Sequence, residues 1–225
     1  MARPPLSPEA VQQQRERALR AAFVLFTRHG VESVSLRAVA QELEMSPMAL
    51  YRYFPGGKGE LLATLRGSGF EALAAELESA IVGVDDLLER LLRLTLALIH
   101  FATSQSALYR LMFDVTQEEE HDVYLATRRE RAWRTASTCF AAAIRAGLLR
   151  GDPKTLPHVF FAAIHGVIAF EFSTQPDPDR RLSRLIGPML ETLFRGSGGS
   201  LATLRRVRRT FRASNPPPVT RRGTS

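Results

Sequence analysis

The chain has 225 residues, 45% apolar and 24% charged, enough to bury a core, and no stretch reaches the roughly 20 apolar residues of a membrane-spanning helix. One cysteine, Cys139, excludes an intrachain disulfide, and the N-terminus lacks a secretory hydrophobic region, so we expect a cytoplasmic protein. The net charge of +7 comes from residues 196–225, which hold seven arginines and no acid, leaving 23 basic and 23 acidic side chains in residues 1–195.

Helical periodicity runs through almost the whole chain, and no convincing alternating strand pattern occurs, which predicts an all-α fold. The first helix is expected from Pro8 to His29, with Gly30 as its C-cap. Further helices are expected over residues 35–43, 46–54, 58–81, 84–103, 106–114, 122–149, 155–174 and 179–194. Residues 196–225 have the composition of a disordered, Arg-rich tail, apart from a short helix predicted over 201–211.

Residues 35–54 contain two short helices joined by a tight turn. Ser35 and Ser46 can each accept a hydrogen bond from the first turn of the helix that follows, and Pro47 suits a first helical position. Their apolar faces are complementary, formed by Leu36, Val39, Ala40 and Leu43 on one helix and by Leu50 and Phe54 on the other. Met48, Tyr51 and Arg52 then lie on the opposite side of the second helix. This arrangement indicates a helix-turn-helix, the unit of many DNA readers.

The same region resembles the head of TetR-family (tetracycline-repressor-like) transcriptional regulators. The resemblance covers about residues 14–65 and rests on the blocks Ala21-Ala22-Phe23, Leu25-Phe26, Gly30, residues 34–40, Met45-Ser46-Pro47, residues 50–54, Lys58 and Leu61-Leu62. Glu44 stands where the family usually has a turn glycine, and residues 55–58 are one residue longer than the usual spacing before the lysine. The resemblance implies a flexible N-terminus (residues 1–7), a DNA-binding head (8–65), a helical ligand-binding and dimerisation body (66–195) and a tail (196–225).

The candidate DNA-binding residues lie in or beside the two short helices: Ser35, Arg37, Ser46, Pro47, Met48, Tyr51, Arg52, Tyr53 and Lys58. Arg52 can donate to a guanine edge or to a phosphate, and the sequence leaves both open. Met48 suits a thymine methyl group, and the tyrosine hydroxyls suit phosphates. Arg37 and Lys58 would neutralise phosphates.

In the body, residues 161–168 resemble the Trp-His-Gly segment of one TetR C-terminal subclass, with Ile164 in place of tryptophan. Their small side chains would allow close approach of a second helix, so the resemblance implies a homodimer that packs through a four-helix bundle. The candidate dimerisation residues are Ala162, His165, Gly166, Ala169, Leu182, Ile186 and Leu190, with Leu185 and Leu193 nearby. Alternatively, these small residues pack within one chain.

The resemblance also implies a small-molecule pocket among residues 60–150. The large side chains there are Phe70, Phe101, Tyr109, Met112, Phe113, Trp133 and Phe140, which would suit an apolar or aromatic effector. The other interpretation of these side chains is ordinary core packing. The scattered histidines show no metal-ligand spacing, and we expect no metal or cofactor.

We therefore predict a regulator that binds a palindromic DNA operator as a homodimer and represses transcription until a small molecule shifts its two heads apart. The alternatives are an activator-type regulator without ligand control and a helical protein-interaction domain that has lost DNA binding. An enzyme is not expected, because the sequence has no Gly-rich phosphate loop and no nucleophile elbow. The arginine tail could attract phosphates or be a solvated extension.

Overall fold

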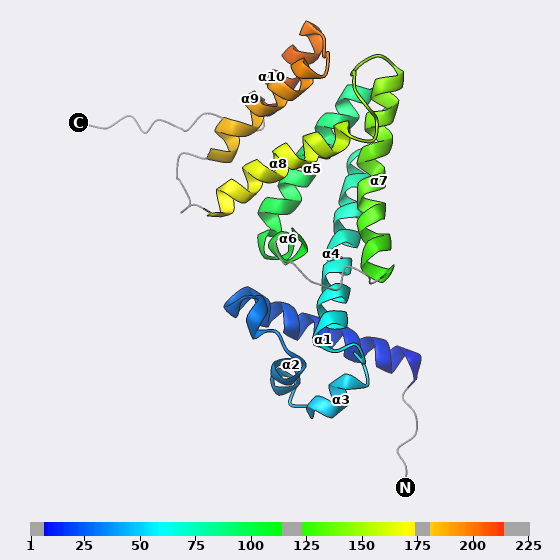
Figure 1. The fold of residues 1–225 in the computed structure, drawn as a ribbon, viewed down its shortest axis with the longest axis vertical. Helices are drawn as coiled ribbons and strands as arrows, with labels where there is room; N and C mark the ends of the chain where they lie inside the picture. The colour runs from blue at the N-terminus through cyan, green and yellow to red at the C-terminus, as the bar shows by residue number, and fades with distance from the viewer. Residues whose placement is uncertain (1–6, 114–122, 174–180, 214–225) are drawn as a thin grey trace, which may run out of the picture. The chain divides into compact units, whose positions relative to one another are not determined.

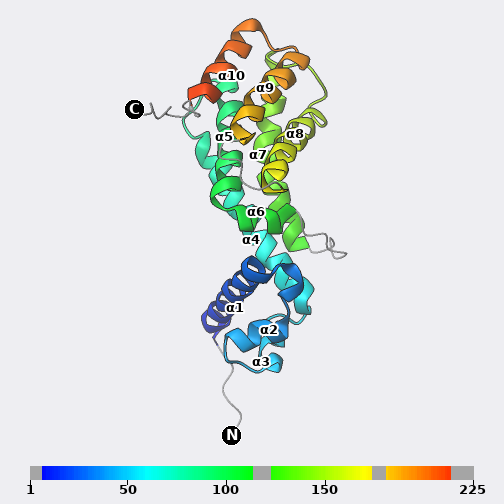
Figure 2. The ribbon, with the colours of Figure 1, turned by 90° about the vertical axis from the view of Figure 1, so that its left-hand side faces the viewer.

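The computed structural model describes residues 7–113, 123–173 and 181–213. These residues form ten α-helices and one 3-10 helix and contain no strand, so the predicted all-α fold is confirmed (Figures 1 and 2). Within the same residues, no helix is both long enough and apolar enough to span a bilayer.

The helices follow the sequence prediction closely. Their bounds are α1 Pro8–His29, η1 Val31–Ser33, α2 Leu36–Glu42, α3 Pro47–Tyr51, α4 Gly57–Ala80, α5 Leu87–Ser104, α6 Ser106–Phe113, α7 Val123–Arg145, α8 Leu156–Ser173, α9 Arg181–Gly196 and α10 Leu201–Ala213. The main difference is α3, which is shorter than the predicted 46–54 because Arg52 already forms its C-cap.

Contacts divide the chain into two compact units. Unit 1 comprises residues 1–75 and 101–133, and unit 2 comprises residues 76–100 and 134–225. The division falls inside α4, α5 and α7 rather than after residue 65. Unit 1 is larger than the predicted head, because Leu111 of α6 belongs to the same buried cluster as the side chains of α1 to α3.

Unit 1 is organised around α1, α2 and α3, which lie beside one another in both views (Figures 1 and 2). Three serines begin the three helices, as Ser7, Ser35 and Ser46 accept hydrogen bonds from the third residue after each of them. The predicted apolar faces meet in one core, with Leu36, Val39, Ala40, Leu50 and Phe54 between 0% and 4% exposed. The short helix α3 is thus anchored from one side only.

Two glycines of α4 allow neighbouring helices to approach closely. A Cβ atom at Gly67 would lie 2.4 Å from Cε1 of Tyr124 on α7, and one at Gly69 would lie 2.7 Å from Sδ of Met112 on α6. Any larger residue would force those side chains to move. These glycines therefore serve the packing of unit 1.

The core of unit 2 contains a row of aromatic rings. The ring of Phe140 lies 4.9 Å from that of Phe160 on α8, which in turn lies 5.1 Å from that of Phe194 on α9. Helix α9 also packs against both α8 and α10. Ring pairs at these distances are favourable beyond the area that they bury.

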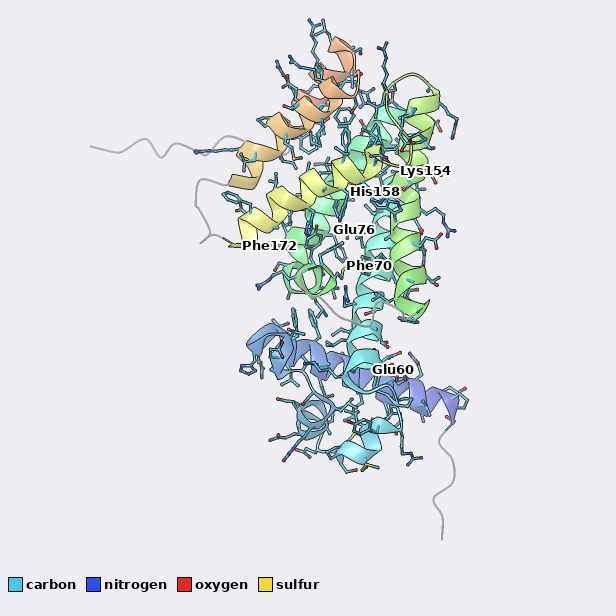
Figure 3. All side chains as sticks on the ribbon, viewed as in Figure 1. Glu60, Phe70, Glu76, Lys154, His158 and Phe172 are labelled. Carbon is cyan, nitrogen blue, oxygen red and sulfur yellow. The ribbon has the colours of Figure 1, made fainter. Side chains whose placement is uncertain are left out.

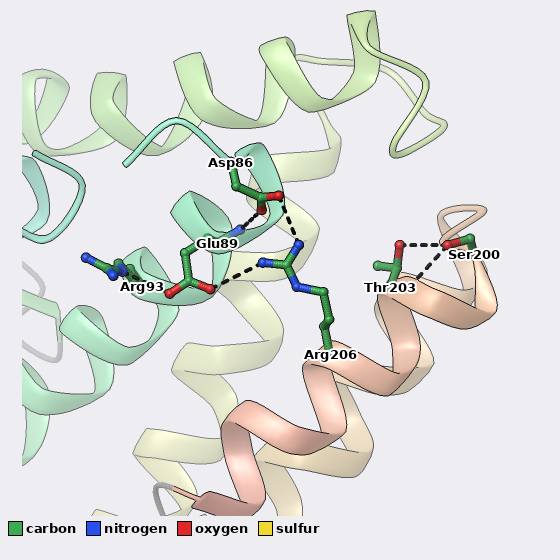
Figure 4. A network of polar contacts seen from close by, with 6 residues as sticks. All are labelled: Asp86, Glu89, Arg93, Ser200, Thr203 and Arg206. Carbon is green, nitrogen blue, oxygen red and sulfur yellow. Dashed lines mark hydrogen bonds and ion pairs between the residues drawn. The ribbon is translucent and has the colours of Figure 1, made fainter. Parts of the chain in front are cut away.

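Helix α10 is the short helix predicted within the arginine-rich tail, and it is packed rather than solvated on all sides. Leu204, Val207 and Phe211 of α10 are at most 6% exposed, so one face of the helix is part of the core of unit 2. Arg206 forms ion pairs with Asp86 at 3.0 Å and with Glu89 at 3.4 Å (Figure 4).

Arg208 of α10 forms a further ion pair, in which its Nε donates to Glu191 of α9 at 2.6 Å. The short helix predicted over 201–211 is therefore confirmed, and it extends to Ala213. The apolar residues of α10 are spaced so that they share one face of the helix, and this face is buried. The amino-acid composition of the segment does not show that such a face exists. Residues 214–225, including Arg221 and Arg222, lie outside the described part of the chain.

Candidate nucleic-acid interface

The turn between α2 and α3 contains an unusual backbone conformation. Glu44 has a φ of +53°, and among the described residues no other non-glycine residue has a positive φ. The turn nevertheless closes, because the amide of Met45 donates to the carbonyl of Ala40 at 2.9 Å. The position where the sequence resemblance expects a glycine does require glycine-like geometry, and Glu44 adopts it at some energetic cost.

The outward side of α3 exposes the side chains that the sequence assigns to DNA. Met48 is 75% exposed and Tyr51 is 48% exposed, while Leu50 between them is fully buried. Ser46, Pro47 and Arg52 are exposed as well. An anchored helix with one free, chemically mixed face can enter a groove without disturbing the core beneath it.

The other positively charged or hydroxyl-bearing candidates have different surroundings. Ser35 is half-buried, and its hydroxyl oxygen already caps α2 through the amide of Ala38 at 3.1 Å. Arg37 on the first turn of α2 is exposed. Nζ of Lys58 lies 3.9 Å from a carboxylate oxygen of Glu32, so the ammonium group has an acidic neighbour in the structure without DNA. Such an exposed pair is weak and can exchange for a phosphate.

Tyr53 is less accessible than the other candidates. The residue is only 9% exposed and belongs to the buried cluster of unit 1, so it is part of the core of the head, and its contact with phosphate stays a prediction. Tyr51 two residues earlier is the accessible tyrosine. The sequence could not separate the two, because the helix ends before Tyr53 and the helical spacing no longer applies there.

The candidate dimerisation residues fall into two groups. Ala162 and Gly166 on α8 are exposed, and His165 and Ala169 are half-buried. Ile186 and Leu190 on α9 are 2% and 0% exposed, so their predicted place in an intermolecular contact is wrong. Their side chains point into the core of their own chain. The side chain of Leu182 lies outside the described residues.

Three large apolar side chains are exposed on the same two helices, and of these the prediction had named only Leu185. Val159 and Phe170 on α8 are 43% and 47% exposed, and Leu185 on α9 is 43% exposed. A Cβ atom at Gly166 would meet nothing within 4 Å. The spacing of Val159, Ala162, Gly166 and Phe170 places them along one side of α8, a signal that was readable in the sequence.

The seven candidate pocket residues are buried or half-buried in the structure. Phe70, Phe101, Tyr109, Met112 and Phe140 are 8% exposed or less, and Phe113 and Trp133 are half-buried. In unit 1 the ring of Phe113 lies 5.4 Å from that of Phe70, which is labelled in Figure 3, and 4.7 Å from that of Tyr109.

A recess of about 310 Å³ in unit 2 is lined by other residues, namely Asp86, Leu87, Leu88, Leu148, Ala202, Thr203 and Arg206. It therefore does not bring the seven candidates together. Their role in binding an effector stays a prediction, and the observed contacts are those of a packed core.

Comparison with known proteins matches both parts of the chain to the same kind of protein. Residues 18–65 match the family described as bacterial regulatory proteins, tetR family, and residues 91–193 match the tetracyclin repressor-like C-terminal domain. The Trp-His-Gly subclass is not among these matches and stays a prediction. The N-terminal match contains α2, α3 and the exposed face of α3.

A curated relative, the HTH-type transcriptional repressor KstR of Mycolicibacterium smegmatis, is 37% identical over 75 residues. That match covers 33% of this chain and 36% of the relative, so it spans about a third of each protein. Among solved structures, a protein of unknown function from Rhodococcus sp. RHA1 is 25% identical, with a TM-score of 0.69 over 81% of this chain and 94% of its own.

The TetR family transcriptional regulator PfmR from Thermus thermophilus is 24% identical, with a TM-score of 0.60 over 80% of this chain and 97% of its own. At that identity the likeness concerns the fold alone.

Proposed function

Because this chain belongs to the TetR family of bacterial regulatory proteins, we propose that it is a DNA-binding transcriptional repressor that binds a palindromic operator as a homodimer. The observation that carries the proposal is the exposed face of α3, where Met48, Tyr51 and Arg52 project from a helix held by the buried Leu50. Repression is supported by the name of the curated relative that matches this head.

The exposed face supplies two kinds of contact. The guanidinium of Arg52 can donate two hydrogen bonds to the O6 and N7 atoms of guanine, and the thioether chain of Met48 can lie against a thymine methyl group. Tyr51 and Arg37, which are also exposed, can donate to phosphate oxygens and fix the register of the helix. Lys58 would exchange its weak pair with Glu32 for a phosphate.

A homodimer follows from the small size of this face. Helix α3 has five residues and can read only a few base pairs, whereas two copies related by a two-fold axis read an inverted repeat. The exposed apolar side chains of α8 and α9, among them Val159, Phe170 and Leu185, would supply the surface that a second copy covers.

Control by an effector is the third part of the proposal. The apolar cluster of Phe70, Tyr109, Met112 and Phe113 in unit 1 would line the site, because an apolar or aromatic molecule can replace side-chain contacts that are already hydrophobic. Met112, which is unbranched, packs against Gly69 and can change rotamer more easily than a ring.

The experiment is selection of bound duplexes from a random-sequence library by the full-length protein, followed by sequencing and light scattering. The expected result is an enriched inverted repeat bound by two copies of the chain. Phe170→Glu should produce monomers, while Val82→Glu, which alters a side chain 77% exposed outside α8 and α9, should leave the dimer intact. A library that yields no enriched motif would contradict DNA reading, and a monomeric wild type would contradict the dimer.

A further inference from the structure

The segment that leaves the exposed helix α3 is held by one side chain from a distant part of the sequence. Arg15 of α1 donates through Nη1 to the backbone carbonyl of Tyr53, the second residue after the end of α3. Nη1 and Nη2 of the same guanidinium also lie 3.0 Å from Oε1 of Glu60 on the first turn of α4. Arg15 of α1 thus contacts both the segment that follows α3 and the first turn of α4.

The guanidinium is also packed against an aromatic ring. Cζ of Arg15 lies 4.4 Å from the ring centre of Phe54, which is fully buried. This stacking fixes the plane of the guanidinium, so its donors point toward the carbonyl of Tyr53 and the carboxylate of Glu60. A lysine could supply the charge but not this planar arrangement of donors.

Glu60 completes the arrangement with its second oxygen. Oε2 accepts from the backbone amide of Gly56 at 2.9 Å, so this carboxylate fixes the segment between α3 and α4 at one end while Arg15 fixes it at the other. Figure 3 labels Glu60 at the beginning of α4. Gly57, the first residue of α4, has a φ of +70°, a conformation that glycine adopts without the strain that a side chain would add.

We propose that Arg15 and Glu60 form a positioning pair that sets the orientation of α3 and thereby determines how well this protein distinguishes its operator from other DNA. This inference rests on the proposed DNA-binding function. Neither side chain needs to touch DNA, since both are only 25% exposed and act through the backbone of residues 53–56. Base contacts require placement within about 0.5 Å, whereas attraction to phosphates tolerates larger errors.

The physical consequence is selective. Removing the Arg15 contacts allows the end of α3 to adopt several orientations, so bidentate contacts to base edges are lost in most of them. Charge–phosphate attraction changes only by the loss of one partly buried charge that already has an acidic partner. The ratio of affinities for specific and non-specific DNA therefore reports positioning, while overall affinity does not.

The test uses the full-length protein with two probes, a duplex selected by the wild type from a random library and a shuffled duplex of the same composition. Arg15→Gln removes the guanidinium, and Glu60→Gln keeps an oxygen acceptor while removing the charge. The matched control is Arg20→Gln, because Arg20 is on the same helix in an exposed pair with Glu16 at 4.0 Å. Dissociation constants are measured by fluorescence anisotropy, and folding is checked by thermal unfolding.

Arg15→Gln should weaken binding to the selected duplex about tenfold or more, with less than a twofold change on the shuffled duplex relative to Arg20→Gln. Glu60→Gln should lower the ratio of affinities for the selected and shuffled duplexes by less than Arg15→Gln does. Arg15→Lys should retain more of that ratio than Arg15→Gln but less than the wild type. Equal behaviour of Arg15→Gln and Arg20→Gln on the two probes would overturn the positioning role.

If Arg15→Gln is unfolded at the assay temperature, Glu60→Gln decides, and a ratio equal to that of the wild type refutes the proposal. A wild type that selects no duplex would instead refute the proposed function, so the two failures are distinguishable.

Discussion

Replacing Phe211 with alanine tests whether α10 belongs to the folded protein. Phe211 is 5% exposed and packs over Gly187 of α9. A Cβ atom added at Gly187 would lie 3.8 Å from the Cβ atom of Phe211. Burial of such a side chain contributes about 1.5–3 kcal/mol, and the cavity left by alanine adds to the loss. We expect the free energy of unfolding to fall by about 3 kcal/mol.

The assay is urea unfolding followed by far-ultraviolet circular dichroism at one fixed protein concentration, because the stability of a dimer depends on concentration. Leu201→Ala is the control, since Leu201 lies on the same helix but is 75% exposed and should change stability by less than about 0.5 kcal/mol. Amide hydrogen exchange over residues 201–213 should accelerate in Phe211→Ala. Equal stability of the two variants would refute the docking of α10.

Three further predictions concern other features of the two units. Glu44→Gly should be more stable than Glu44→Ala by about 1 kcal/mol in urea unfolding, because both remove the charge but only glycine relieves the positive φ. Gly67→Ala should lower stability by about 1 kcal/mol despite the better helix propensity of alanine, since its Cβ would collide with Tyr124, and a gain in stability would contradict that close approach.

The last of the three concerns pH. The hydrogen bond from Arg206 holds the pKa of Asp86 below its ordinary value, so this carboxylate stabilises the fold at neutral pH and loses that effect as the pH falls below about 4. Asp86→Asn should therefore lower the free energy of unfolding by well under about 1 kcal/mol at neutral pH, as expected for an exposed ion pair. The difference should vanish once the pH is low enough to protonate Asp86 in both the folded and the unfolded protein. If Asp86→Asn is still less stable than the wild type at low pH, the loss of stability does not come from the charge of Asp86.

The sequence was most informative where the determining contacts are local. Ser7, Ser35 and Ser46 cap their own helices within three residues, and α1 begins and ends at its predicted residues. Leu50 faces inward and Met48 outward because two residues along an α-helix turn the side-chain direction by about 200°, onto the opposite face. Such signals depend on the residues immediately around them.

Features that depend on distant residues were harder to predict. Ile186 and Leu190 fit a dimer surface by composition, yet contacts within unit 2 bury them. Helix α10 pairs with Asp86, which lies more than a hundred residues earlier, and the contacts of Arg15 with residues 53 and 60 also join separate parts of the sequence. Periodicity indicates that a face is apolar but not which surface will cover it.

The most direct test of the account is the affinity of a variant in which Met48, Tyr51 and Arg52 are all replaced by alanine, measured on the selected and shuffled duplexes. These side chains are exposed, so the thermal unfolding midpoint should stay within about 2 °C of the wild type. We expect the affinity of this variant for the selected duplex to fall to that for the shuffled duplex. A variant that still prefers the selected duplex as strongly as the wild type would contradict DNA reading by α3.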